Sequence, residues 1–123
     1  MTRIPTLKDT RFKAFFAISP GTARGFNRSR QFEEINNPVF ILGTESDNIT
    51  PVESYARKYH RLISNSSYYE FPGKAGHYVM LAEANKKMKE ELPVPFADHP
   101  TVDRREIHKK VSHLALQFFK QNL

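Results

Sequence analysis

The sequence predicts an α/β fold in which about three parallel strands are covered by helices on both faces of the sheet. Three short strand-like runs bounded by turn residues alternate with helix-like segments, and such alternation is typical of parallel strands joined by right-handed crossovers. The first run is apolar on both of its faces from Ala14 to Ile18, as expected of a strand in a sheet covered on both sides. The length of 123 residues fits a single domain.

The composition narrows the classes of function. The chain has no Cys, which excludes disulfides, thiolate zinc sites and a cysteine nucleophile. No apolar run approaches the roughly 18 residues of a membrane span, and the first residues lack the apolar core of a secretory signal. We therefore expect a cytoplasmic protein without a membrane partner.

The formal net charge of +6 permits binding to nucleic acids or other anionic surfaces. The basic residues are scattered, however, and the densest pairs lie on predicted helices with acidic residues nearby. These pairs are Lys86-Lys87, Arg104-Arg105 and Lys109-Lys110. Solvated helix faces are the preferred interpretation, so nucleic acid is not expected as a partner. A basic interaction module stays open as an alternative function.

The first predicted strand covers Phe12–Ser19 and ends at Pro20-Gly21, a strong turn signal. The residues before it, 1–8, have the character of a frayed leader or a cut end. A Gly- and Arg-rich loop follows the strand. A short helix is predicted over Ser29–Ile35, whose two apolar residues fall three positions apart.

The second predicted strand, Val39–Leu42, is a continuous apolar run rich in β-branched and aromatic residues. Gly43 is predicted to turn the backbone sharply after it. The next helix is predicted over Pro51–Ile63, because Pro suits the first helical position and Thr50 with Glu53 spells a capping box. The apolar residues of this helix recur along one face.

The third predicted strand, Ser67–Phe71, ends at a Pro-Gly pair. A helix is predicted over Tyr78–Leu92, where two following prolines stop it. The last helix follows Asp103, an N-cap residue with Glu106 three positions later. The buried face predicted for this helix consists of Ile107, Val111, Leu114, Ala115 and Phe118.

Two polar residues at strand ends are candidates for chemistry. Asp47 follows the second strand and His77 follows the third, and the carboxyl ends of parallel strands share one edge of a sheet, where ligands and catalytic groups collect. An acid and then a histidine are the last two members of the Ser…Asp…His series of α/β-hydrolases, in which the acid orients the histidine. The plainer interpretations are a turn-forming Asp47 and a capping or packed loop His77.

Three stretches resemble the C-terminal half of a dienelactone-hydrolase-like α/β-hydrolase. They are residues 11–20 (RFKAFFAISP), 38–51 (PVFILGTESDNITP) and 76–83 (GHYVMLAE). The tail from Asp98 to His108 and the Phe118-Phe119 pair are similar to that family's ending too. The resemblance covers residues 9–123 and implies a truncated hydrolase fold in a single partial domain, residues 1–123. It also implies Asp47 as the triad acid, His77 as the triad base and a small ester as a ligand.

The chain departs from this family at the nucleophile. No Gly-x-Ser-x-Gly motif occurs, and the glycine spacing of residues 21–25 has Ala at its centre. The family's nucleophile elbow and oxyanion-hole loop would precede this segment, so we expect a hydrolase-derived fragment that is not a competent esterase alone. The alternatives are a working esterase or lactone hydrolase that uses Ser19 or Ser46, or one completed by a partner chain.

A lone half of the fold would leave Ala14–Ile18 as an unpaired apolar edge, which is a template for another chain. We therefore expect a homodimer that pairs these edges antiparallel and forms a six-stranded sheet. The sequence predicts no cofactor. A metal site built from His99, Asp103 and His108 is conceivable, but no ligand spacing is diagnostic and no metal site is predicted.

Overall fold

The computed structural model describes residues 9–22 and 24–123, so the predicted leader, residues 1–8, lies outside the described residues. The elements in chain order are β1 (Phe15–Ile18), the 3₁₀ helix η1 (Ser29–Gln31), β2 (Val39–Thr44), α1 (Ala56–Leu62), β3 (Ser66–Phe71), the 3₁₀ helix η2 (His77–Met80), α2 (Lys86–Glu91), α3 (Pro93–Phe96) and α4 (Arg104–Asn122). Within the described residues, no helix combines the length and the apolar character needed to cross a membrane.

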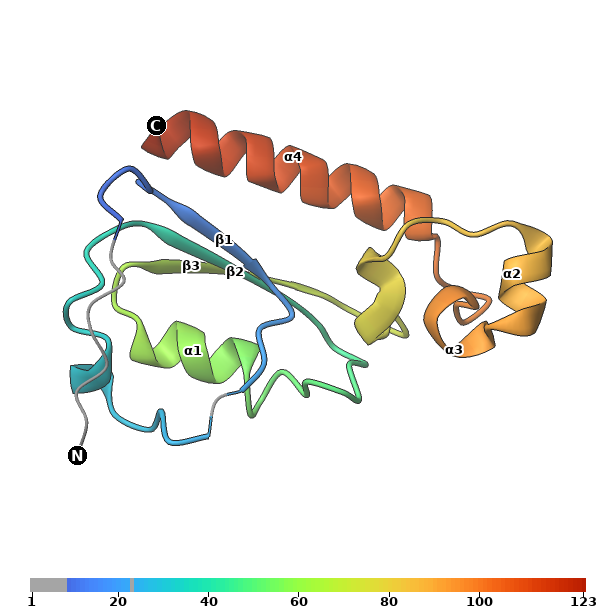
Figure 1. Cartoon of the computed structure of the whole chain (residues 1–123), viewed down its shortest axis with the longest axis horizontal. Coiled ribbons are helices and arrows are strands. Elements are labelled where there is room, and N and C mark those ends of the chain that lie inside the picture. The colour runs from blue at the N-terminus through green and yellow to red at the C-terminus, as the bar shows by residue number, and fades with distance from the viewer. Residues whose placement is uncertain (1–8, 23) are drawn as a thin grey trace.

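The three strands form one parallel sheet in the order β1-β2-β3. The register places Ile18 beside Leu42, and Leu42 beside Tyr69. Helix α1 packs on one face of the sheet and α4 packs on the other (Figure 1). The predicted α/β class, with about three parallel strands and helices on both faces, is therefore confirmed.

The central strand β2 is buried along its whole length, and its alternate residues supply two separate cores. The core beneath α1 contains Phe32, Val39, Ile41, Val52, Ala56 and Ile63. The core beneath α4 contains Phe40, Leu42, Phe71 and Phe118. Successive side chains of a strand point to opposite faces, so one unbroken apolar run serves both layers. Each large apolar side chain that is fully buried contributes about 1.5–3 kcal/mol.

Gly43 lies inside β2, where it pairs with Glu70, so the turn predicted at this position is wrong. An added Cβ would lie 2.8 Å from Val52 Cγ1 and 3.2 Å from Ala56 Cβ. Both distances are shorter than the optimal separation of two carbon atoms, about 3.5–4.0 Å. Gly43 is therefore needed for the close approach of α1 and its preceding turn to the sheet.

The helix predicted over Pro51–Ile63 forms only as α1, and residues 52–55 are turns. The capping box predicted for Thr50 and Glu53 does not form. The Thr50 hydroxyl donates to Asp47 instead, and Glu53 forms an ion pair with an arginine of α1. The helix begins late because its expected cap is bound to a carboxylate outside the helix.

The helix predicted over Ser29–Ile35 is reduced to η1. The side-chain carbonyl of Gln31 accepts the backbone N–H groups of Asn27 and Arg28 at 2.9 and 3.0 Å. The side-chain amide of Gln31 donates to the Gly25 carbonyl at 2.9 Å. These contacts close a compact local loop in place of further helical turns.

The prediction of one continuous helix over Tyr78–Leu92 is wrong, because residues 81–85 are not helical. The structure has η2, then an extended stretch, and then α2, whose N-cap is Asn85. In the extended stretch the carbonyls of Leu81 and Ala82 accept hydrogen bonds from Arg104. A contact from a distant part of the chain thus replaces the helical hydrogen bonds.

Of the last two helices, α3 was not predicted, because Pro93 and Pro95 were expected only to stop the helix before them, whereas α4 begins as predicted. Pro93 occupies the first position of α3, where its fixed φ suits a helix, so it opens a helix as well as ending α2. Asp103 caps α4 as predicted, and its carboxylate accepts the N–H groups of Arg105 and Glu106 at 3.0 and 3.1 Å. The α4 side chains that pack on the sheet include Ile107, Val111, Leu114 and Phe118.

Gly43→Ala is expected to lower the free energy of unfolding by about 1–3 kcal/mol, because the added methyl group overlaps Val52 in a packed core. Urea denaturation followed by circular dichroism measures the change. Gly76→Ala is the matched control, since an added Cβ there meets nothing within 4 Å and φ is −94°. Equal midpoints for the two variants would contradict the packing role of Gly43.

Candidate functional site at the carboxyl edge of the sheet

The carboxyl ends of β2 and β3 lie side by side, and the loops that follow them carry the two predicted site residues. The register that pairs Thr44 with Phe71 brings both loops to one edge of the sheet. Asp47 lies in the loop after β2, and His77 begins η2 after β3. Asp47 Oδ2 lies 2.8 Å from His77 Nδ1, so the structure brings the predicted acid and the predicted base together.

Asp47 is only 5% exposed, but its carboxylate has many donors. Its Oδ1 accepts the N–H groups of Ile49 and Thr50 at 2.9 and 2.7 Å. Its Oδ2 accepts the Thr50 hydroxyl at 2.9 Å in addition to His77. Burial raises the pKa of this carboxyl, but the hydrogen bonds from Thr50, His77 and Ile49 outweigh burial and hold the pKa below its usual range. Asp47 is therefore an anion at neutral pH.

His77 is oriented through its Nδ1 atom. Since Asp47 is an anion that can only accept, Nδ1 carries the proton and donates, and Thr50 Oγ1 lies 3.2 Å from the same nitrogen. In the neutral imidazole this leaves the lone pair on Nε2, which is the arrangement of a histidine that acts as a general base. The His77 side chain is 23% exposed. It borders a cavity of about 200 Å³ that is also lined by Lys74 and His99.

The loops after β2 and β3 are also tied together by contacts that the sequence did not predict. Ser46 Oγ donates to the Gly73 carbonyl at 2.6 Å, and the Gly73 N–H donates to Glu45 Oε2 at 2.6 Å. Gly73 has a φ of 83°, a left-handed conformation that favours glycine. The Pro-Gly turn is a sequence signal in itself, but its partners lie in another loop, so only the folded chain reveals the contact.

Neither serine considered as a substitute nucleophile contacts His77 in the part of the chain that the structure describes. The hydroxyl of Ser46 is hydrogen-bonded to the Gly73 carbonyl. Ser19 follows β1 in a left-handed conformation with a φ of 44°, and its hydroxyl is buried without a hydrogen-bond partner among the described residues. A serine acts as a nucleophile only when a base contacts it, so neither hydroxyl is poised for attack.

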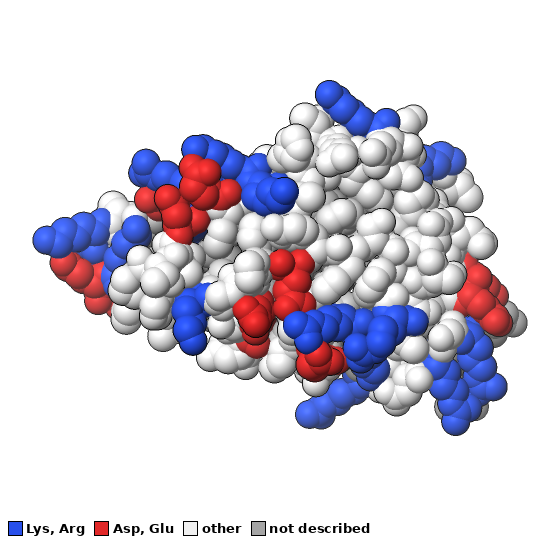
Figure 2. Space-filling model, turned by 180° about the vertical axis from the view of Figure 1, so that it is seen from behind, with Lys and Arg blue, Asp and Glu red and all other residues white. Residues whose placement is uncertain are grey.

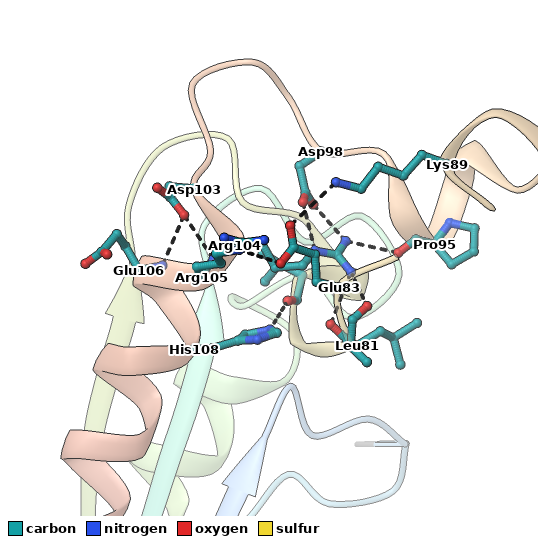
Figure 3. A network of polar contacts seen from close by, with 12 residues as sticks. Leu81, Glu83, Lys89, Pro95, Asp98, Asp103, Arg104, Arg105, Glu106 and His108 are labelled. Carbon is teal, nitrogen blue, oxygen red and sulfur yellow. Dashed lines mark hydrogen bonds and ion pairs between the residues drawn. The ribbon is translucent and has the colours of Figure 1, made fainter. Parts of the chain in front are cut away.

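Arg104, the first residue of α4, fixes the segment that follows η2. Its side chain is 5% exposed and forms two hydrogen bonds to the Asp98 carboxylate, at 2.8 and 2.9 Å. The same guanidinium donates to the carbonyls of Leu81, Ala82 and Pro95 at 3.1, 3.3 and 3.0 Å (Figure 3). A guanidinium has five N–H donors in a fixed fork, and this site uses them to hold three carbonyls and one carboxylate.

Helix α4 also holds η2 directly. His108 Nε2 donates to the Val79 carbonyl at 2.7 Å (Figure 3). Val79 is buried in the same short helix that begins with His77. Arg104 and His108 are four residues apart and so lie on one face of α4. One turn of α4 therefore anchors both η2 and the segment after it, and it positions the loop that presents His77.

The residues considered for a metal site are not brought together. Among the residues that the structure describes, no group of three His, Cys, Asp or Glu side chains could hold a metal ion. His99 Nδ1 lies 2.8 Å from Thr101 Oγ1, and His108 donates to a backbone carbonyl. The carboxylate of Asp103 caps α4.

Basic residues do not form one continuous surface on the face shown in Figure 2. Lys and Arg side chains lie there in separate groups, several of them beside Asp or Glu. Arg57 contacts both Glu53 and Glu70, and Arg105 lies 2.5 Å from Glu83. Each of these pairings reduces the local positive field.

Comparison of the chain with protein-family models, with curated proteins and with solved structures found no match. The resemblance to dienelactone-hydrolase-like proteins therefore stays a prediction from three sequence stretches and the tail. The candidate site is defined by its own geometry, which is the hydrogen-bonded pair of Asp47 and His77 at the carboxyl edge of the sheet.

Arg104→Met is expected to destabilise the fold by about 3–5 kcal/mol, because it keeps much of the side chain's apolar stem but leaves the Asp98 carboxylate without its partner in a largely buried site. Chemical denaturation measures the loss. Arg105→Met is the matched control, since Arg105 is the next residue and its pair with Glu83 is solvent-exposed. We expect little change for the control, and similar losses in both variants would contradict the role of Arg104.

Asp47→Asn is expected to change how stability depends on pH. The folded-state pKa of Asp47 is lowered, so the unfolded chain binds its proton more readily and the carboxylate stabilises the fold above about pH 4, the usual Asp pKa. The stability advantage of the unchanged chain over Asp47→Asn should shrink as the pH falls through the lowered pKa. Urea unfolding at several pH values measures it, and an advantage that stays constant from about pH 7 to about pH 2 would contradict the expectation.

Proposed function

We propose that this chain is a hydrolase-derived α/β fragment that retains the acid and the base of an ester-hydrolysing site, Asp47 and His77, but not a nucleophile. On this proposal the isolated chain does not hydrolyse esters. The observation that carries the proposal is the 2.8 Å contact between Asp47 Oδ2 and His77 Nδ1. It lies at the carboxyl edge of a parallel sheet, where catalytic groups collect in such folds.

Each member of the pair has the properties that its proposed role needs. In an acid–histidine pair, the carboxylate holds the imidazole in one tautomer and stabilises the imidazolium that forms when a proton is accepted. Asp47 is buried and has a lowered pKa, so it stays ionised and oriented. His77 would accept the proton of a nucleophile at Nε2, the nitrogen that the bond to Asp47 leaves available.

The parts that are missing explain the expected lack of activity. The sequence has no Gly-x-Ser-x-Gly motif. The Thr50 hydroxyl contacts Nδ1 of His77 and donates to Asp47, so it lies on the wrong side of the ring for activation by Nε2. An oxyanion hole is also required, since the loss of a single donor from one costs about 10²–10³ in kcat.

A second candidate is an esterase or lactone hydrolase that a partner chain completes. The observation that favours it is the position of β1 at an edge of the sheet, beside the strand that leads to Asp47. A parallel strand added at this edge would end at the same side of the sheet as β2 and β3. A nucleophile that follows such a strand would lie near the Asp47–His77 pair.

Hydrolysis of a short-chain aryl ester by the purified chain tests the proposal. We expect the same rate from the unchanged chain and from His77→Ala, because an oriented base without a nucleophile does not support turnover. Turnover that His77→Ala abolishes would overturn the proposal. Ser19→Ala and Ser46→Ala would then identify the nucleophile.

A spectroscopic readout tests the acid–base pair itself and does not depend on activity. In ¹⁵N NMR, neutral His77 is expected to carry its proton on Nδ1, and Asp47→Asn should weaken that preference. His99 gives an internal contrast, because its Nδ1 accepts the Thr101 N–H at 3.3 Å. A proton found on Nε2 of neutral His77 would contradict the proposed orientation.

A further inference from the structure

Strand β1 is an unprotected edge of the sheet. It pairs with β2 and with no other described strand (Figure 1). Residues 14–19 contain no charged residue and no proline, and Phe15 and Ile18 are 43% and 40% exposed. Native proteins usually protect such edges with charges, proline or a bulge, because an open edge can pair with another strand. We therefore expect another strand to pair with this edge.

The backbone of β1 offers hydrogen-bonding groups to that occupant. The N–H of Phe15 donates to the carbonyl of Pro38, just before β2, at 3.0 Å, and the N–H of Ser19 donates to the carbonyl of Leu42 in β2 at 2.8 Å. Backbone groups alternate in direction along a parallel strand. The N–H and C=O groups of the intervening residues Phe16 and Ile18 therefore point away from β2.

The opposite edge of the sheet is different. Strand β3 contains Glu70, which forms an ion pair with Arg57 at 2.6 Å and also accepts a hydrogen bond from it at 2.8 Å. A paired charge within an edge strand opposes strand addition. Of the two edges, β1 is therefore the one suited to pairing.

Helix α4 adds an apolar stripe next to β1. The ring of Phe119 lies 6.2 Å from that of Phe16, so this side of α4 packs over β1. Leu116 and Leu123 lie three residues before and four residues after Phe119, on the same helical face, and they are 55% and 80% exposed. The open edge and the exposed stripe are thus neighbouring parts of one surface.

We propose that β1 pairs with β1 of a second copy of this chain, antiparallel and about a two-fold axis at Ala17, so that the two sheets join into one sheet of six strands. The inference does not depend on the proposed inactive fragment, because it rests on the sheet edge and involves neither Asp47 nor His77. It is incompatible with the second candidate, in which a strand of a different partner chain would occupy the same edge of β1. A two-fold contact of this kind is closed, since each copy covers the other copy's open edge.

The directions of the backbone groups and the side-chain sizes favour this register over one with an axis at Phe16. Only the outward-facing residues can bond, so an axis at Ala17 pairs Phe16 of each copy with Ile18 of the other. The small Ala17 then faces its own counterpart in a non-hydrogen-bonded pair, with Cα atoms about 4.5 Å apart. An axis at Phe16 would instead oppose two rings that already stack on Phe40 at 4.8 Å.

The same symmetry explains the exposed stripe on α4. A two-fold axis perpendicular to a continuous sheet keeps both copies of α4 on the same face. Each helix then brings Leu116 and Leu123 toward the junction above the paired β1 strands. A second copy therefore covers both the backbone edge and the apolar stripe, whereas a single added peptide strand would leave the stripe exposed.

Disulfide trapping tests the register, because the chain has no cysteine of its own. Under mild oxidation Ala17→Cys is expected to form a covalent dimer, since the Cα separation of about 4.5 Å suits a disulfide. Ser67→Cys on β3 is the matched control and should stay monomeric on a non-reducing gel. Trapping of both variants alike, or of Ser67→Cys alone, would overturn the proposal.

The mass in solution tests the dimer without a cysteine. Light scattering should give about twice the chain mass of 14.3 kDa, and Ile18→Lys should lower it to the mass of one chain, because a charge on the edge strand opposes pairing. Leu92→Lys is the control, a residue that is 51% exposed and lies outside the proposed interface. A single-chain mass for the unchanged protein, or a Leu92→Lys effect equal to that of Ile18→Lys, would overturn the proposal.

Discussion

The buried carboxylate of Asp47 constrains more of this structure than any other single group. A charge that is removed from water must be hydrogen-bonded, since an isolated buried carboxylate is strongly destabilising. Asp47 meets this requirement with two backbone N–H groups, one hydroxyl and one imidazole. The first three bonds close the turn from Asp47 to Thr50, and the fourth fixes His77. The late start of α1 follows as well, because Thr50 is bound to Asp47 and does not cap the helix.

The start of α4 also fixes the position of His77, because it binds the residues that follow His77 in the chain. The guanidinium of Arg104 draws the segment after η2 into an extended path, and His108 holds the carbonyl of Val79 within η2. The histidine therefore lies between two fixed points, the Asp47 carboxylate and a helix near the end of the chain. Its position is determined by residues some thirty positions away on either side, which is the kind of over-determination that orients a functional group.

The sequence predicted the features that depend on local signals. The three strands follow from short strand-like runs bounded by turn residues, the α4 cap follows from Asp103, and the meeting of Asp47 with His77 follows from the shared carboxyl edge of parallel strands. The errors arose where a distant group overrides a local preference. The helix expected to continue past Met80 ends there, and the Leu81 carbonyl accepts a hydrogen bond from Arg104 in place of a helical one. Gly43 was expected to form a turn, but it lies in a strand where it permits close packing. Neither the contact with Arg104 nor the close packing around Gly43 can be recognised from the neighbouring residues in the sequence.

The two members of the candidate pair differ in how far the fold depends on them. Asp47 is buried and closes its own loop, so it is needed by the structure whether or not a nucleophile is present. His77 is partly exposed and supplies only one of the carboxylate's bonds, so its loss would leave Asp47 largely satisfied. The presence of Asp47 therefore says little about catalysis in this chain. His77 is the more informative residue for a catalytic role, because the stability of the fold depends on it less than on Asp47. Its Nδ1 is nevertheless bound to the Asp47 carboxylate, and the short helix that it begins is bound to α4.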